Sequence, residues 1–519
     1  MNPEPGIDYD READVLISLG KVDGNAEFNM TALAVRGSRL HNGVSRIHGE
    51  VSARMLSALW PAVEPRENPI AHVTNGIHVP TFLATEWHEL FDRYVGHGWS
   101  RRLTDVARWE CVYAIPDLPF WSVHQSLKAQ MLHLVRHRIA ERNTRNFGSE
   151  SHLDRMLRLA DPANPNVLTI GFARRFATYK RATLLFRDLD RLRALICNSQ
   201  RPVVFIFAGK AHPADEPGQQ VIRQIAQIAK MPDFESHVLL VEGYDLQLAR
   251  RLVSGVDVWL NNPVHPLEAS GTSGMKASIN GVLNLSVLDG WWDEGYDGRN
   301  GWAIKPASSK LDEARRDEEE ARTLYELLQD KIVPLYYDRG SVGYSMTWVE
   351  MAKHAIASLL PRFNSMRMLD EYVDDFYVPA ARQFARYREH DYAAAREVAA
   401  WKAKVRAAWS SLTIRRVDQP LMRIRFNETL NIRISVHLDG LDPSDVVVEL
   451  LLGRPGMLSS ERYGSHRLEH IGLAPDGTDH LYALALTPEL CGKLDYQVRV
   501  YPHHELLTHR FEMGMMKWL

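Results

Sequence analysis

Five short and almost entirely apolar segments in the middle of the chain constrain its fold more than any other feature. They are VLTIGF (167–172), VVFIFAG (203–209), HVLLVEG (237–243), VDVWL (256–260) and VLNLSVL (282–288). Helical patterns such as RATLLFRDLDRLRALI (181–196) and PGQQVIRQIAQIAK (217–230) separate them. Because apolar strands alternating with helices are typical of βαβ units, we expect an α/β fold with a parallel sheet covered on both faces. Ligands should collect at the carboxyl ends of its strands.

The chain has a different pattern on either side of this region. Residues 1–85 show short polar helical patterns without a run of strands, and residues 86–155 read as helices, the clearest from Trp121 to about Asn146. Helical patterns continue to about Leu412, and strand-like runs such as LNIRISVHLDG and LDYQVRVYP then alternate with Gly, Pro and Asp turns. This change predicts an all-β, sandwich-like domain over 417–519, after an α/β lobe over 86–380 and a helical segment over 381–416.

Composition excludes several classes of protein. The 519 residues include 62 Lys and Arg against 65 Asp and Glu, which argues against a nucleic-acid partner. The three cysteines, Cys111, Cys197 and Cys491, are too few and scattered for a disulfide framework or a thiolate metal site. No apolar run reaches the ~18 residues that cross a bilayer. We therefore expect a soluble, cytoplasmic, multidomain enzyme with neither a membrane nor a metal as partner.

A cationic segment follows the first strand-like run. ARRFATYKR (173–181) places Arg174, Arg175, Lys180 and Arg181 within eight positions, with Tyr179 among them. At an effective dielectric of about 20, two unit charges 4 Å apart interact by about 4 kcal/mol, so these cations repel one another unless an anion lies between them. A bound phosphate, assisted by the N-terminus of the following helix, satisfies this need. A basic surface turn paired with acidic residues elsewhere is the alternative.

A second segment is rich in small residues and ends in a lysine. EASGTSGMK (268–276) leaves backbone N–H groups free to bind an oxyanion and lets a ligand approach closely. Lys276, near the start of a short helix, could neutralise phosphate or form a Schiff base, and Glu268 could accept hydrogen bonds from sugar hydroxyls. The alternative interpretation of this segment is a glycine-rich turn that leads into a helix with an exposed lysine.

Three further features are less specific. Lys210 follows another strand in a glycine–lysine turn, but the spacing is not that of a P-loop. His48, His72, His78, His212 and His265 lack the spacing of metal ligands. GWWDEGYDGRNGWAI (290–304) combines aromatic rings with carboxylates, which suits a sugar site and equally a tight structural loop.

Six segments in collinear order resemble the α-glucan (glycogen, starch and maltodextrin) phosphorylase family, and its bacterial branch in particular. They are EASGTSGMK (268–276), RRFATYKR (174–181), NGVSRIHGEV (42–51), TNGI (74–77), AGKA (208–211) and EGY (242–244). The resemblance covers most of residues 25–410, and the closing β domain is similar to the C-terminal extension of that branch. It implies a glycosyltransferase-B fold, of which this chain holds the C-terminal Rossmann-like lobe, and retaining phosphorolysis of α-1,4-glucan to glucose 1-phosphate.

The resemblance also implies a cofactor. Lys276 would hold pyridoxal 5'-phosphate as an imine, and the phosphate of the cofactor would exchange a proton with inorganic phosphate. The implied contacts to the cofactor come from Arg174, Lys180, Thr272, Ser273 and Tyr244. Dense positive charge would let the two phosphates approach without a metal.

The implied substrate contacts fall on the same two segments. Arg175 and Lys180 would bind inorganic phosphate and act in catalysis. The glucosyl hydroxyls would be bound by Glu268, Ser270, Gly271 and Tyr179. Arg174 stands where many family members have lysine, and that substitution keeps the charge but alters the geometry.

The largest departure is at the amino end. Family members have some 400 or more residues before the segment matched by 42–51, so residues 1–85 are expected to be the remnant of a first lobe. A fragment, a split-gene product with a separate N-terminal lobe polypeptide as partner, and a degenerate copy all fit, and we expect the chain alone to release no glucose 1-phosphate. A non-catalytic glucan-binding or regulatory protein and a nucleotide-sugar glucan synthase are the alternative functions. A homo-oligomer is compatible with each.

Overall fold

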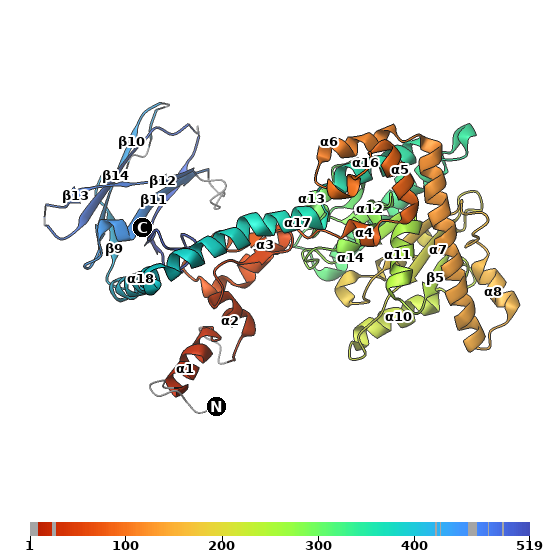
Figure 1. Ribbon diagram of the computed structural model, residues 1–519, viewed down its shortest axis with the longest axis horizontal. Helices are drawn as coiled ribbons and strands as arrows, with labels where there is room; N and C mark the ends of the chain where they lie inside the picture. Colours follow the sequence, from red (N-terminus) through yellow and green to blue (C-terminus); the bar gives the residue numbers. More distant parts are fainter. Residues whose placement is uncertain are drawn as a thin grey trace. The chain divides into compact units, whose positions relative to one another are not determined.

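The computed structural model describes residues 9–22, 27–420, 423–425, 427–454, 464–475, 477–489 and 492–519 (Figure 1). Residues 1–8, which open the expected remnant, and Cys491 lie outside this part of the chain. The chain folds into two compact units. The α/β unit comprises residues 44–48 and 73–371, and the β unit comprises the described parts of 1–43, 49–72 and 372–519.

The α/β unit is built on one parallel sheet of six strands. Their order in the sheet is β5-β4-β3-β6-β7-β8, and all neighbouring pairs are parallel. The strands are β3 (Leu168–Ala173), β4 (Val203–Ala208), β5 (Val238–Val241), β6 (Val258–Asn261), β7 (Leu283–Val287) and β8 (Gly301–Ile304). The five predicted strands and the parallel sheet are confirmed. Strand β8 was not predicted, because its four residues lie inside the aromatic-rich loop.

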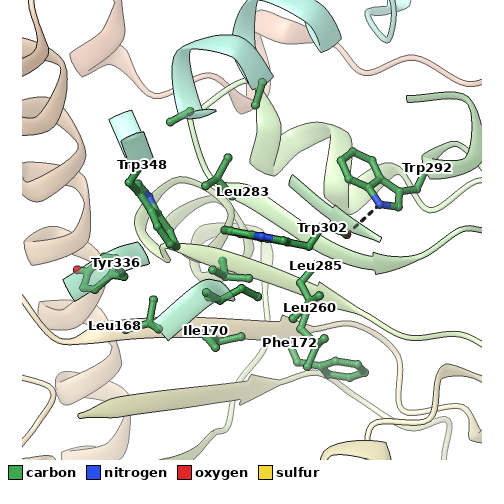
Figure 2. Close-up of a cluster of buried hydrophobic side chains, with 14 of the residues drawn as sticks. Leu168, Ile170, Phe172, Leu260, Leu283, Leu285, Trp292, Trp302, Tyr336 and Trp348 are labelled. Atoms are coloured by element: carbon green, nitrogen blue, oxygen red, sulfur yellow. Dashed lines mark hydrogen bonds between the residues drawn. The ribbon is translucent and has the colours of Figure 1, made fainter. Parts of the chain in front are cut away.

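The strands bury both faces, as their continuous apolar runs predict. Within β4, Val203, Phe205 and Phe207 point into one core, while Val204, Ile206 and Ala208 point into the other. This alternation is the two-residue period of a strand. In the larger core the rings of Trp302, Trp348 and Tyr336 pack in a row with centroids 5.5 and 5.0 Å apart (Figure 2).

Helices cover each face of the sheet. On one face α7 (Asp117–Arg145) and α11 (Leu246–Gly255) lie side by side (Figure 1). On the other lie α9 (Leu189–Ile196), α10 (Glu216–Ile228), α14 (Glu313–Leu327) and α16 (Met346–Leu359). The remaining α-helices of this unit are α4 (Val79–Phe82), α5 (His88–Tyr94), α6 (Val106–Trp109), α8 (Glu150–Leu157), α12 (Thr272–Ser278), α13 (Trp292–Gly295), α15 (Val333–Tyr337) and α17, which runs over Ser365–Tyr372.

The prediction of one helix over 181–196 was wrong in its first half. A 3-10 turn, Leu184–Phe186, precedes α9, which begins at Leu189 with the Asp188 carboxylate capping the N–H of Arg191. Leu184, Leu185 and Phe186 are all buried in that turn. The packing of three consecutive apolar side chains is incompatible with a regular amphipathic helix, whose apolar side chains occupy one face.

The β unit contains a sandwich of two four-stranded antiparallel sheets, as predicted. One has the order β13-β14-β10-β9 and the other β12-β11-β15-β16, and Ile434, Val448 and Val498 from the two sheets share one core. The strands are β9 (Thr413–Arg416), β10 (Leu430–His437), β11 (Val446–Gly453), β12 (Gly464–Arg467), β13 (Glu469–Leu473), β14 (His480–Leu486), β15 (Asp495–Pro502) and β16 (Lys517–Trp518). The unit also holds α1 (Tyr9–Leu19), α2 (Met30–Arg36), most of α3 (Arg46–Met55), α18 (Val378–Ala408) and the short parallel pair β1 (Asn42–Gly43) and β2 (Ala71–His72).

A buried ion cluster joins the segment around residue 67 to the sandwich. Arg499 of β15 is fully buried and donates to Glu449 on the neighbouring strand β11, at 2.6 Å, and to Glu67. The side chains of both carboxylates are at most 5% exposed. Trp60 and Val63 pack against Val447 beside this cluster. Residues 57–72 therefore fold with the sandwich.

Helix α18 is interrupted by three consecutive residues in the left-handed conformation. His390, Asp391 and Tyr392 have φ angles of 48°, 53° and 62°. Each costs an L-residue roughly 1–2 kcal/mol, and glycine avoids this cost. We expect His390→Gly to raise the unfolding free energy of the β unit by about 1 kcal/mol. Ala399→Gly, at an exposed position where α18 is regular, should lower it by about 1 kcal/mol in the same urea titration.

Candidate active site

The two segments singled out in the sequence meet at one edge of the parallel sheet. Residues 174–181 follow β3, and residues 262–271 follow β6. These strands are neighbours in the sheet, and the chain connections leave them in opposite directions. That position is the topological switch point of a doubly wound sheet, where ligands of such folds bind.

The loop after β3 is held by the loop after β4. The Arg174 N–H donates to Ala208 O at 3.1 Å, and the Phe176 N–H donates to Lys210 O at 3.0 Å. Gly209 lies between them with φ +155°, and a Cβ there would be 2.0 Å from Arg174 O. Only glycine allows this approach. The backbone of the cationic segment is thereby fixed.

A buried carboxylate lies between two of the predicted phosphate ligands. Glu268 pairs with Lys180 and lies 3.4 Å from the Arg174 guanidinium, and all three side chains are less than a tenth exposed. Burial lowers the pKa of Arg174, and Glu268 opposes that shift. Arg174 also donates to the Asn261 Oδ1, whose amide nitrogen donates to the Ser286 Oγ at 3.0 Å. Tertiary contacts therefore orient both cations.

The other two cations of the segment differ in environment. Arg181 is buried and pairs with Asp317, at 2.8 Å, and with Glu320 of α14, so it is a structural ion pair. Arg175 has an exposed side chain. The predicted assistance from a following helix N-terminus was wrong, because α9 begins only at Leu189. Of the predicted phosphate ligands, the structure thus brings together Arg174 and Lys180.

The small-residue segment makes a tight entry into helix α12. Gly271 precedes the helix with φ +83°, and its Cβ would lie 3.3 Å from the Glu268 side chain. The first N–H groups of a helix lack intrahelical partners, which leaves those of Thr272 and Ser273 to a ligand. The Ser273 hydroxyl accepts a hydrogen bond from Trp259 Nε1 at 3.2 Å. The Ser270 Oγ is buried without a hydrogen bond in the described part of the chain, which suits a ligand hydroxyl.

The turn after β7 supports this segment from behind. Asp289 is fully buried, and its carboxylate accepts hydrogen bonds from Glu268 N–H at 3.0 Å and Gly290 N–H at 2.8 Å. The Trp291 N–H donates to Ser270 O at 2.9 Å. The position of Glu268 is therefore set by a polar residue at the end of another strand.

Lys276 lies in the last turn of α12, not near its start as predicted, because the helix begins at Thr272. Its ammonium is 4.3 Å from the centroid of the Phe82 ring, and burial lowers its pKa. Asn280 links the backbones of the two residues: its side-chain amide donates to Phe82 O at 2.9 Å and to Lys276 O at 2.8 Å. A half-buried amine with a lowered pKa is a competent nucleophile toward an aldehyde.

The two predicted tyrosines line the same region. The Lys180 ammonium is 4.6 Å from the Tyr179 ring centroid, and Tyr179 O accepts from Val264 N–H at 2.7 Å. Tyr244 is half-buried, and burial raises its pKa, while the charge of Arg174 opposes that shift. Lys210 is exposed.

The tryptophans of the aromatic loop and two of the five histidines have structural roles. The rings of Trp291, Trp292 and Trp302 are at most 7% exposed, so they are part of the core and do not form a sugar platform. His48 and His212 accept hydrogen bonds from backbone N–H groups two to four residues away. Among the described residues, no three His, Cys, Asp or Glu side chains are grouped to hold a metal ion, and no helix is long and apolar enough to cross a membrane.

Sequence reasoning missed three residues that shape the site: Asn261, Phe82 and Asn280. Asn261 was recognisable as a polar residue at the carboxyl end of an apolar strand, where ligands and their supports collect. Phe82 and Asn280 carried no such signal, because they meet Lys276 only through tertiary packing.

Comparison with known families places the chain in one of them. A family model described as carbohydrate phosphorylase matches residues 7–292, more than half of the chain. The chain belongs to the carbohydrate phosphorylase family. A second model, described as the glycogen phosphorylase C-terminal domain, matches residues 409–519, which include both sheets of the sandwich. The resemblance seen in the sequence is confirmed.

Several relatives within the phosphorylase family align over almost all of this chain, and others over a smaller part of it. The maltodextrin phosphorylase of Thermococcus litoralis is 41% identical over 97% of the chain, and the glycogen phosphorylase of Mycobacterium tuberculosis is 39% identical over 99%. The chain spans 58% of the length of each of these two relatives. The glycogen phosphorylase of Aquifex aeolicus is 43% identical over 68% of the chain and 50% of its own length.

Proposed function

We propose that this chain forms the part of an α-1,4-glucan phosphorylase that binds cofactor and phosphate, in a reaction that releases glucose 1-phosphate with retention. The observation that carries the proposal is a half-buried lysine of lowered pKa at the edge of the sheet where two oriented cations also lie. In this proposal the α/β unit is the C-terminal Rossmann-like lobe of a glycosyltransferase-B fold. The sandwich is the C-terminal domain of the bacterial branch.

The residues present fit pyridoxal 5'-phosphate. Lys276 is an amine suited to carry its aldehyde carbon, and Arg174, Lys180 and the free N–H groups of Thr272 and Ser273 suit its phosphate. The side chain of Tyr244 borders the same region near Arg174. When bound, the cofactor supplies a phosphate group that exchanges a proton with inorganic phosphate.

The substrate groups would be bound by residues around Glu268. Arg175, exposed at the edge, and Lys180 would hold inorganic phosphate, and their charge would stabilise two phosphates at close approach. The unsatisfied Ser270 hydroxyl and the Glu268 carboxylate suit glucosyl hydroxyl groups. Gly271 and Tyr179 would complete this sugar site.

The cofactor claim is tested by reduction with borohydride after incubation with pyridoxal 5'-phosphate. Peptide mapping is expected to place the pyridoxyl group on Lys276. The exposed Lys210, on the loop after β4, is the internal control and should remain unlabelled at stoichiometric cofactor. Folded protein without label at Lys276 would contradict the proposal and favour the glucan synthase, which needs no lysine there.

The lowered pKa of Lys276 has a measurable consequence. Because burial disfavours the ammonium, the neutral amine that reacts with an aldehyde is present at lower pH than for an exposed lysine. The pH profile of borohydride-trapped labelling should therefore have its midpoint below the ordinary value of about 10.4 for lysine. A profile that coincides with the non-specific labelling of surface lysines would show that burial does not tune this amine.

A further inference from the structure

The Glu268 carboxylate is involved in two interactions that exclude each other. The proposed function gives it the glucosyl hydroxyls, whereas the structure pairs it with Lys180 and with Arg174. Lys180 is in turn the cation that the proposed function gives to phosphate. The phosphate site and the sugar site therefore share an ion pair.

Burial makes this sharing consequential. The side chains of Lys180, Arg174 and Glu268 are 8%, 9% and 6% exposed, so water screens their charges poorly. A phosphate that approaches Lys180 meets the negative charge of Glu268 on the same ammonium. Glu268 thus occupies, within the folded chain, the electrostatic position that a phosphate requires.

The backbone of Glu268 cannot simply move away with its side chain. Its N–H is bound by Asp289, and the following Ala269 carbonyl accepts a hydrogen bond from Ser45 at 2.7 Å. The carboxylate can respond only by turning about its own side-chain bonds. The adjacent Ser270 hydroxyl, buried without a partner, marks where a polar ligand would sit beside it.

We propose that Glu268 is the internal counter-ion of the phosphate site and couples phosphate binding to glucan binding. Phosphate that takes Lys180 releases the carboxylate for sugar hydroxyls, and sugar that takes the carboxylate releases Lys180 for phosphate. The coupling is positive and, as an equilibrium property, equal in both directions. This inference rests on the proposed function and adds to it an interaction between the two substrates.

The test uses the full chain loaded with pyridoxal 5'-phosphate and two probes, inorganic phosphate and maltoheptaose. Phosphate affinity is measured by isothermal titration calorimetry at constant ionic strength, with and without saturating maltoheptaose. In the wild-type chain maltoheptaose should tighten phosphate binding by at least about fivefold, the lower end of typical coupling between sites. Glu268→Gln keeps the shape and removes the charge, so it should tighten phosphate binding without maltoheptaose by a similar factor and lose the coupling.

Glu326→Gln is the matched control, because it makes the same charge change at an exposed position on α14. It should leave both the phosphate affinity and the coupling unchanged. If Glu268→Gln does not fold, Glu268→Asp decides, since it keeps the charge but withdraws the carboxylate by one methylene. That variant should show a smaller tightening in the same direction.

Two negative results have different meanings. The coupling is overturned if wild type and Glu268→Gln bind phosphate with equal affinity, or if maltoheptaose does not change the phosphate affinity of the wild type. Either result leaves the phosphate site intact. A wild type that binds no phosphate in either condition removes the phosphate site, and the proposed function fails together with the inference.

Discussion

Replacement of Lys128 by methionine is expected to lower the unfolding free energy of the α/β unit by about 3–5 kcal/mol. Lys128 of α7 is fully buried and donates to Asp257, at 2.5 Å, and to Val167 O. Asp257 also accepts hydrogen bonds from His124, at 2.8 Å, and from Thr169 N–H, at 2.7 Å. Methionine fills the space of the lysine stem but leaves the buried Asp257 carboxylate without its main counter-charge.

The pH dependence of stability sharpens this prediction. Burial alone would raise the pKa of Asp257, but Lys128 and His124 outweigh it and hold that pKa below its ordinary value. The wild-type contribution is therefore fully present above the unfolded-state pKa of about 3.9 and is lost as the pH falls through the lower folded-state pKa. Native-state hydrogen exchange of α7 measures the loss, and exposed Lys310→Met is the control. A loss below about 1 kcal/mol would mean that the pair is solvated and contributes as little as a surface ion pair.

Replacement of Arg499 by methionine should destabilise the β unit by a similar amount, about 3–5 kcal/mol. It leaves two buried carboxylates, Glu67 and Glu449, without their buried cation and with only the half-exposed Arg510, at 3.6 and 3.7 Å. Loss of the guanidinium also removes its stacking on Phe511, 4.9 Å from the ring centroid. The segment around Glu67 should detach first, because only two of its apolar side chains, Trp60 and Val63, are buried in this core, while Leu59, Ala62 and Ile70 are partly buried against it.

Neutralisation of both carboxylates should restore part of the stability lost in Arg499→Met. A loss caused by poor packing alone would not be restored in this way. The triple variant Glu67→Gln, Glu449→Gln, Arg499→Met should recover at least half of the loss, since no buried charge remains. Hydrogen exchange of β15 reports on this unit, and that of α7 reports on the other. Arg499→Met should leave α7 exchange unchanged, and Lys128→Met should leave β15 exchange unchanged. Equal effects on both would show that the two ion clusters do not act on separate units.

The strands were the most predictable part of the fold. Segments such as 203–209 are apolar at every position. A short, fully apolar segment of this kind is typical of a strand that is buried on both faces of a sheet, so the sequence predicts both that a strand is present and that it is a central one. Strand β8 and the first half of the segment 181–196 escaped prediction because local pattern is outweighed there by packing against other elements. Leu184, Leu185 and Phe186 are buried as a 3-10 turn that no helical period describes.

The candidate site also has a part that was predictable from the sequence and a part that was not. The segments ending at Lys180 and Lys276 were found because cations and small residues are unusual directly after apolar strands. Which of these cations are available to bind a ligand depends on acidic residues from distant parts of the chain. Arg181 is neutralised by Asp317 and Glu320 of α14, which lie more than 130 positions further along the chain.

The sequence by itself determined the parallel sheet, the separate β domain, the family and the two segments that meet beyond the strands. The family follows from the resemblance of six collinear segments, and the other three follow from period and local composition, which act between near neighbours. Only the tertiary structure decided that Glu268 lies between Lys180 and Arg174, that Phe82 covers Lys276 and that residue 67 belongs with the sandwich. The physical reason is the sequence separation of the interacting residues. Buried charges such as Lys180 and Arg499 are neutralised by partners 88 and 432 positions away, and no local sequence pattern specifies which partner that is.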